Sequence, residues 1–73
     1  MDSLKMILTP RQFEVAGLVA KGLRNKDVAN LLNIKVSTMR VFLKKSFDRA
    51  GCETRTALAV RYVLEEERGL YKT

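Results

Sequence analysis

The sequence predicts an all-α fold of four short helices packed around one core, in a single domain that covers residues 1–73. Apolar side chains recur at helical spacing in four segments, and no segment shows the alternation expected of a strand. Four Gly and one Pro leave little room for long loops. The length suits one domain, and a hydrophobic content of 47% is typical of a globular chain.

The first helix is expected at residues 10–21. Thr9 is a suitable N-cap, Pro10 suits the first helical position, and Gln12 can bond back to the cap. Apolar residues then follow at helical spacing, at Phe13, Ala16, Val19 and Ala20. Gly22 can adopt the left-handed conformation that ends a helix, so the helix is expected to stop before it.

The next two helices form a helix-turn-helix unit. The second is expected at residues 25–32 with Asn25 as its N-cap, and the third at residues 36–49, ended by Gly51. Only residues 33–35 join them, and a short helix, a tight joint and a longer helix define this motif. A fourth helix is expected at residues 55–67, after the N-cap candidate Thr54.

The third helix has two faces of different chemistry. Its core face is expected to carry Met39, Phe42, Leu43, Phe47 and Ala50. At about 100° per residue, the opposite face carries Ser37, Val41 and Lys44, flanked by Arg40 and Lys45. The major groove of DNA admits one α-helix, where Arg or Lys can donate to guanine and an apolar side chain can contact the thymine methyl group. We therefore expect base contacts from Ser37, Arg40, Val41 and Lys44.

The charge distribution points to the same partner. The net charge is +6, and residues 35–49 hold five basic side chains against one acidic residue, Asp48. A local excess of positive charge favours a polyanion. In a DNA complex we expect phosphate contacts from Lys35, Lys45 and Arg49.

Several function classes are disfavoured by the composition. The chain has no His and one Cys, which leaves almost no ligands for zinc and excludes Ser–His or Cys–His catalysis. Neither paired acids at a cleft nor a glycine-rich phosphate loop is evident, so we expect no enzyme, no cofactor and no metal. No apolar run of about 18 residues and no signal peptide are present, so a cytoplasmic location without membrane contact is expected.

From residue 8 to about residue 64 the sequence resembles the LuxR-type (GerE-type) helix-turn-helix domain. The matching landmarks at the family's spacing are Leu8-Thr9-Pro10-Arg11, Glu14-Val15, Gly22, Asn25-Lys26, Ala29, Leu32, Ile34, Thr38, Gly51 and Arg55-Thr56. The resemblance implies a four-helix fold, with the third helix as recognition helix, that binds double-stranded DNA as a dimer through the fourth.

The NarL-like branch of that family is the most similar. It presents Lys-Val at the positions of Arg40-Val41 and Lys at the position of Lys44, and these residues contact bases there. The resemblance also implies phosphate contacts from Lys26 and Thr38. The chain departs from the family at Lys35, where Ser usually caps the helix, and at Ser46, where an apolar residue is usual.

The fourth helix is apolar on more than one side, so one apolar side is expected to meet a second copy of the chain. We expect the dimer interface at Thr56, Val60 and Val63, with Leu58 and Tyr62 as the alternative, and a helix buried without any partner as a third possibility.

The leading hypothesis is thus a sequence-specific, DNA-binding transcription regulator, for which RNA polymerase is a further candidate partner. One alternative is a protein-binding adaptor module of the same fold, which would grip its partner with the fourth helix or with Phe13 and Phe42. Another is a promoter-reading domain like that of sigma factors. Steep weakening of binding with salt would separate DNA binding from an apolar protein contact.

Overall fold

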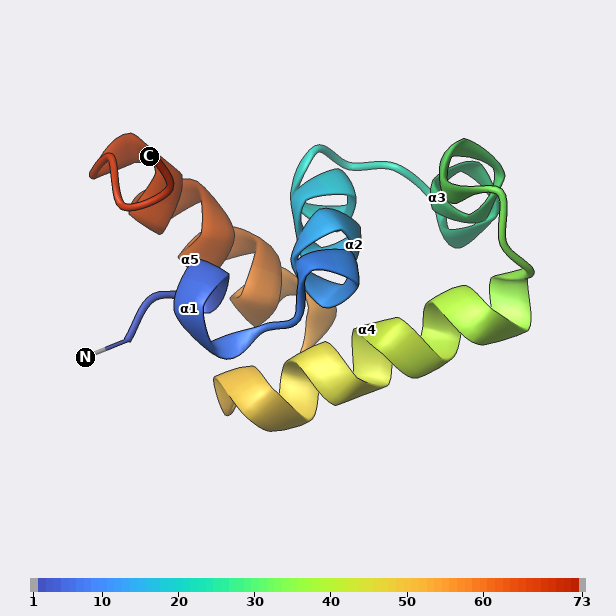
Figure 1. The fold of residues 1–73 in the computed structure, drawn as a ribbon, viewed down its shortest axis with the longest axis horizontal. Helices are drawn as coiled ribbons and strands as arrows, with labels where there is room; N and C mark the ends of the chain where they lie inside the picture. Colours follow the sequence, from blue (N-terminus) through green and yellow to red (C-terminus); the bar gives the residue numbers. More distant parts are fainter. Residues whose placement is uncertain (1, 73) are drawn as a thin grey trace.

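The computed structural model describes residues 2–72 and shows five helices over that range. They are α1 (Leu4–Ile7), α2 (Pro10–Ala20), α3 (Asn25–Leu32), α4 (Val36–Ala50) and α5 (Arg55–Glu67) (Figure 1). The all-α prediction is confirmed, since no strand occurs among these residues. The four expected helices are present, with ends that differ from expectation by at most one residue, whereas α1 was not predicted.

Side-chain capping marks the start of two helices, α2 and α5. Thr9 Oγ1 accepts a hydrogen bond from Gln12 N at 3.2 Å, and Gln12 Oε1 accepts one from Thr9 N at 3.1 Å, which completes a capping box at α2. Thr54 Oγ1 accepts from Ala57 N at 3.0 Å at the start of α5. The expected helix ends hold as well, since Asn33 and Gly51 adopt left-handed conformations with φ of 55° and 67°.

The predicted cap of α3 is wrong. Arg24, not Asn25, occupies the N-cap position, and no side chain bonds to the free backbone N–H groups there. Asn25 is the first helical residue, and its Oδ1 accepts a hydrogen bond from Arg55 Nη1 at 2.6 Å. The Asn25 side chain therefore bonds to a residue 30 positions away and does not cap its own helix.

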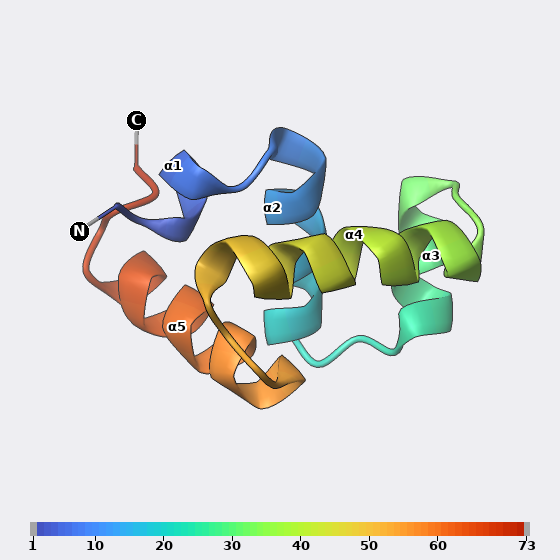
Figure 2. The same cartoon turned by 90° about the horizontal axis from the view of Figure 1, so that it is seen from below.

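The core forms where α2 packs between α4 and α5 (Figure 1). Every helix contributes at least one buried apolar residue, and the core comprises Leu4, Leu8, Val15, Ala16, Val19, Val28, Ala29, Met39, Leu43 and Leu58. Seen from below, α4 crosses in front of α2 and α3 (Figure 2). One side of α4 therefore meets the core, and the opposite side forms an outer face of the molecule.

Ser46 lies on the core side of α4 and is completely buried. Its Oγ donates to the carbonyl oxygen of Phe42 at 2.8 Å, one helical turn earlier. A buried hydroxyl is tolerated when it has a hydrogen-bond partner, and this one is supplied by the same helix. The departure from an apolar residue at this position therefore leaves the packing of α4 intact.

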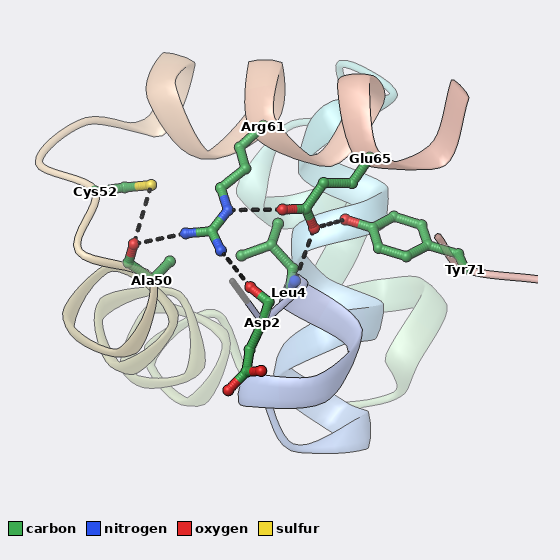
Figure 3. Close-up of polar contacts among 7 residues, drawn as sticks. All are labelled: Asp2, Leu4, Ala50, Cys52, Arg61, Glu65 and Tyr71. Atoms are coloured by element: carbon green, nitrogen blue, oxygen red, sulfur yellow. Dashed lines mark hydrogen bonds and ion pairs between the residues drawn. The ribbon is translucent and has the colours of Figure 1, made fainter. Parts of the chain in front are cut away.

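A polar cluster joins α5 to both ends of the chain (Figure 3). The Glu65 carboxylate accepts hydrogen bonds from Leu4 N at 2.7 Å and Tyr71 Oη at 3.0 Å, and Arg61 Nε lies 2.9 Å from Glu65 Oε2. Arg61 also donates to the carbonyl oxygens of Ala50 and Asp2, at 2.8 and 2.9 Å. These bonds hold α1 against α5. None of the helices between residues 2 and 72 has the length and apolarity to cross a membrane.

Candidate nucleic-acid interface

The outer face of α4 carries all four predicted base-contact residues. Ser37, Arg40, Val41 and Lys44 are exposed, and Val41 is 51% exposed although it is apolar. Met39 and Ser46, on the opposite side of the same helix, are fully buried. The two faces expected from the sequence are therefore both present. Their contact with DNA stays a prediction.

The cations of this face form no ion pair with any acidic side chain between residues 2 and 72. Across residues 2–72 the ion pairs are Arg11–Glu14 and Arg61–Glu65, neither of which involves α4. Arg40, Lys44 and Lys45 are exposed, so their charged groups remain available to an external anion. Within α4 the nearest negative charge in sequence is Asp48, which is also exposed.

The predicted phosphate-contact residues have different surroundings. Lys26, in the first turn of α3, and Thr38 and Lys45, on α4, are all exposed. Lys35 is exposed at the N-cap position of α4, where its side chain makes no capping hydrogen bond. Arg49 differs, because its Nη1 donates to the carbonyl oxygen of Ile7 at 3.2 Å and so helps to hold the end of α1.

The helix-turn-helix unit is packed firmly enough to orient this face. Val28 and Ala29 of α3 are buried with Met39 of α4 in the common core. The turn is closed by a hydrogen bond of 2.9 Å from Ile34 N to the carbonyl oxygen of Ala29. Because Asn33 supplies the left-handed residue at the turn, α4 starts in a defined direction relative to α3.

The sequence did not predict the contact of Arg55 with the start of α3. Nη2 of Arg55 donates to the carbonyl oxygen of Leu23 at 2.7 Å, in addition to the bond from Nη1 to Asn25. The Arg55-Thr56 pair had been noted as a family landmark without a role. The residues around Arg55 in the sequence gave no local signal of this contact.

The three residues of the first predicted dimer seam are exposed on α5, and their contact with a second copy stays a prediction. Thr56 is exposed, and Val60 and Val63 are 52% and 39% exposed. The alternative seam is wrong, since Leu58 is fully buried and Tyr62 packs against the ring of Phe13 with centroids 5.3 Å apart. A helix buried on all sides is also ruled out by the exposure of Val60.

An open hollow of about 310 Å³ lies along this strip, lined by Ala20, Ala59, Val60, Val63 and Leu64. All five lining residues are apolar, and Leu64 is 46% exposed. An apolar surface of this kind on α5 suits a protein contact better than a contact with DNA. It lies on a different helix from the basic face of α4, so the two surfaces are built from separate elements.

Phe13 and Phe42, the other residues considered for protein binding, are both partly buried against the core. Phe13 also meets Tyr71 edge to face, with ring centroids 4.7 Å apart. Its ring is therefore committed to an intramolecular aromatic cluster. Of the surfaces considered for protein binding, α5 therefore offers exposed apolar side chains, and the two Phe rings do not.

The fold and this interface define a helix-turn-helix protein whose second helix presents a basic outer face. The family model for bacterial regulatory proteins of the luxR family matches residues 6–62. The chain therefore belongs to the luxR family, as the resemblance at the sequence level predicted.

Known relatives agree with this placement. The chain is 37% identical over 60 residues to the monoamine regulon transcriptional regulator of Klebsiella aerogenes, a match that covers 82% of this chain and 26% of that protein. It is 36% identical over 62 residues to the response regulator Rre1 of Synechocystis, covering 85% and 26% of the two chains. It is 38% identical over 53 residues to the nitrate/nitrite response regulator protein NarL of Escherichia coli, a match that covers 73% of this chain and 24% of that protein.

The chain thus spans about a quarter of the length of the curated relatives it matches. These relatives are transcriptional or response regulators by name, and the expected likeness to the NarL branch is confirmed. No solved structure matches the chain significantly.

Proposed function

We propose that this chain is a sequence-specific, double-stranded-DNA-binding transcription regulator that inserts α4 into the major groove. The observation that carries the proposal is the exposed row of Ser37, Arg40, Val41 and Lys44 along a helix whose other side is buried. Arg40 and Lys44 donate to base edges, and Val41 contacts a thymine methyl group. Ser37 lies at the start of the same row, where its hydroxyl can serve either as donor or as acceptor.

Phosphate contacts from both helices of the motif position α4 in the groove. Lys26 is supplied by α3, and Lys35, Thr38 and Lys45 come from the start and outer side of α4. Arg49 contributes its charge at the other end of α4 while one of its nitrogens holds Ile7. Such contacts set orientation and most of the affinity, whereas the base contacts set the sequence preference.

Two copies of the chain bind together through α5. The exposed strip of Thr56, Val60 and Val63 is repeated in each copy, as a two-fold interface requires. The two recognition helices then enter major grooves about one helical turn apart, or a multiple of that distance. As a transcription regulator, the bound dimer would act on RNA polymerase, its expected third partner.

To test this function, the wild-type chain is used to select the duplexes that it binds from a pool of random-sequence DNA. Binding of the recovered duplex is then measured for wild type, Arg40→Ala and Arg68→Ala at several salt concentrations. Arg68 is an exposed residue at the end of α5 with the same charge, outside the proposed interface. We expect Arg40→Ala to lose roughly 1–3 kcal/mol of binding free energy and to discriminate less between bases. Arg68→Ala should bind with the affinity and selectivity of wild type.

Two results would contradict the proposal. One is an Arg40→Ala variant that binds the selected duplex as tightly and as selectively as wild type. The other is a failure to enrich any duplex, together with salt-insensitive capture of a protein partner, which would favour the adaptor module instead. Enrichment of promoter elements only in the presence of polymerase core would favour the sigma-factor-like alternative.

A further inference from the structure

The start of α3 is weakly held by its own sequence. The N-cap residue, Arg24, makes no side-chain capping bond, and the helix has only eight residues. Isolated helices of this length are unstable in water, and an uncapped first turn lowers the stability further. Contacts from elsewhere in the fold are therefore needed to set the position of this turn.

Arg55 supplies such contacts from the first position of α5. Its guanidinium spans the residue that precedes Arg24 and the residue that follows it, with Nη2 2.7 Å from the carbonyl oxygen of Leu23 and Nη1 2.6 Å from Asn25 Oδ1. A planar guanidinium offers two donors in a fixed geometry, which an ammonium group does not. The backbone of Arg55 is itself anchored, because Thr54 caps α5.

Lys26 directly follows Asn25 in the turn that Arg55 restrains. Its side chain is exposed and is one of the proposed phosphate contacts. Arg55 is only partly exposed and donates to two acceptors inside the fold. Its guanidinium is therefore placed to fix where Lys26 stands, and it can influence DNA binding without touching DNA.

We propose that Arg55 is a positioning residue for DNA binding, which links the dimer helix α5 to the DNA-contacting first turn of α3. This inference rests on the proposed function and names a link within it. Thr56, the next residue, belongs to the proposed dimer seam, so adjacent residues of α5 serve the partner copy and the helix-turn-helix unit.

A double-mutant cycle tests the link. Affinity for the duplex recovered from the random pool is measured for wild type, Arg55→Ala, Lys26→Ala and the double variant. We expect Arg55→Ala to weaken binding roughly 2- to 30-fold, the range seen for residues that act through a network. Lys26→Ala should then weaken the Arg55→Ala background clearly less than it weakens wild type, because Lys26 is already misplaced. Fully additive losses would overturn the proposal, since independent residues add.

Two further variants separate positioning from charge. Arg55→Lys keeps the positive charge and loses the two donors in fixed geometry. We expect it to bind the duplex nearly as weakly as Arg55→Ala. Asn25→Ala removes one of the two acceptors, and we expect a smaller loss that is likewise sub-additive with Lys26→Ala. Wild-type affinity in Arg55→Lys would overturn the proposal, because charge alone would then suffice. Arg68→Ala serves as the control for the loss of one Arg and should bind like wild type.

Hydrogen exchange in the free protein gives a readout that needs no DNA. The amide of Val28 bonds to the carbonyl oxygen of Arg24 at 3.0 Å and reports on the first turn of α3. We expect it to exchange faster in Arg55→Ala than in wild type, by a larger factor than amides in the middle of α2. Equal acceleration everywhere would indicate loss of global stability and would contradict a local positioning role.

The outcomes distinguish this inference from the proposed function. If Arg40→Ala weakens binding and Arg55→Ala does not, the function stands and the positioning role is wrong. If no duplex is enriched, the DNA-binding function fails and takes the positioning role with it.

Discussion

Arg61 and Glu65 form an ion pair one helical turn apart on α5, with Arg61 Nε 2.9 Å from Glu65 Oε2 (Figure 3). The pair is partly buried, since the side chains are 30% and 11% exposed. Exposed pairs of this spacing contribute little. Here each partner has further bonds: Glu65 accepts from Leu4 N and Tyr71 Oη, and Arg61 donates to two backbone carbonyl oxygens. The cluster therefore holds both ends of the chain on α5.

The first prediction is a loss of stability in acid that depends on Glu65. Burial alone raises the pKa of Glu65, but hydrogen bonds from Arg61, Leu4 and Tyr71 outweigh it and lower the pKa below 4.5. A carboxyl with a lowered folded pKa stabilises the fold above its unfolded pKa, and this stability is lost as pH falls through the folded pKa. Urea unfolding at stepped pH should show a plateau above about pH 5 and a decline below it.

Glu65→Gln is the matched variant for this prediction. It keeps the size of the side chain and removes the titrating group, so we expect about 2 kcal/mol less stability at pH 7, in the range for a hydrogen bond to a charged group. The acid decline should be shallower than in wild type, because the other carboxyls still titrate. Parallel curves for the two proteins would show that Glu65 does not carry the effect.

A loss of folding stability at alkaline pH is expected from Tyr71, which donates a hydrogen bond to Glu65. Burial and the bond to the Glu65 carboxylate raise the pKa of Tyr71. A group with a raised folded pKa stabilises the fold below its unfolded pKa, about 10 for Tyr, and the contribution is lost as pH rises beyond that value. Tyr71→Phe should therefore lose less stability than wild type between about pH 10 and pH 12, as measured by the same urea titration.

The second prediction concerns the close approach of α2 and α5. A Cβ atom on Gly17 would lie 2.7 Å from Tyr62 Oη and 3.0 Å from its ring carbon Cζ. Gly17→Ala would normally stabilise a helix by up to about 1 kcal/mol. Tyr62 cannot easily move, because its ring packs on Phe13 and Tyr71. We therefore expect Gly17→Ala to destabilise the protein by about 1–3 kcal/mol, as overpacking does.

Removal of the Tyr62 hydroxyl provides the check on this explanation. In a Tyr62→Phe background the nearest atom to the added methyl group is gone, so Gly17→Ala should cost clearly less than in wild type. Rescue should be partial, because the ring itself remains within close contact. Thermal unfolding of the four proteins of this cycle measures the coupling directly. Equal losses in both backgrounds would mean that the Tyr62 hydroxyl is not the cause of the destabilisation.

How much the sequence revealed depended on whether a signal was local. Thr9–Gln12, Asn33 and Gly51 are short-range signals, and the structure confirms each of them. The two faces of α4 were predictable because burial follows helical period. Helix α1 was missed, because four residues show no periodicity and the segment is held by Glu65, 61 positions away.

The errors have the same origin. Asn25 has the side chain of a good N-cap, but Arg55 offers it a charged partner that no local pattern reveals. On α5 the helical spacing of apolar residues showed two apolar sides without showing which one meets α2. Only the structure assigns Leu58 to the core and Val60 to the surface. Residues whose role depends on contacts distant in sequence were the ones that sequence reasoning could not place.

The third prediction tests the proposed dimer. Val60→Asp puts a charge in the middle of the apolar strip of α5, where Val60 is 52% exposed. We expect dimer affinity to fall at least about tenfold, since an unpaired charge is costly in an interface. Met6→Asp, at a 72% exposed position on α1, is the matched control. Sedimentation equilibrium gives the monomer–dimer constants, and an unchanged constant in Val60→Asp would place the interface elsewhere.

The last prediction is that replacing Lys35 raises the stability of the fold and lowers its affinity for DNA. This residue has the extended backbone of an N-cap, with φ of −73° and ψ of 151°, but makes no capping bond and puts a cation at the positive end of α4. Lys35→Ser should therefore stabilise the protein by about 0.5–2 kcal/mol. If Lys35 contacts a phosphate as proposed, the same variant should bind the selected duplex more weakly, with a salt dependence lower by about one ion.

The opposite signs of these two effects make the test sharp. Lys72→Ser removes the same charge from an exposed position near the end of the chain, outside α4. It should leave both the unfolding free energy and the salt slope close to the wild-type values. If Lys35→Ser is more stable and binds DNA like wild type, Lys35 is only a poor cap. If it is less stable, the long side chain of Lys35 packs on the fold in a way that outweighs the missing cap. A stable variant with weakened binding would show that the cation at this helix end serves DNA and not the fold.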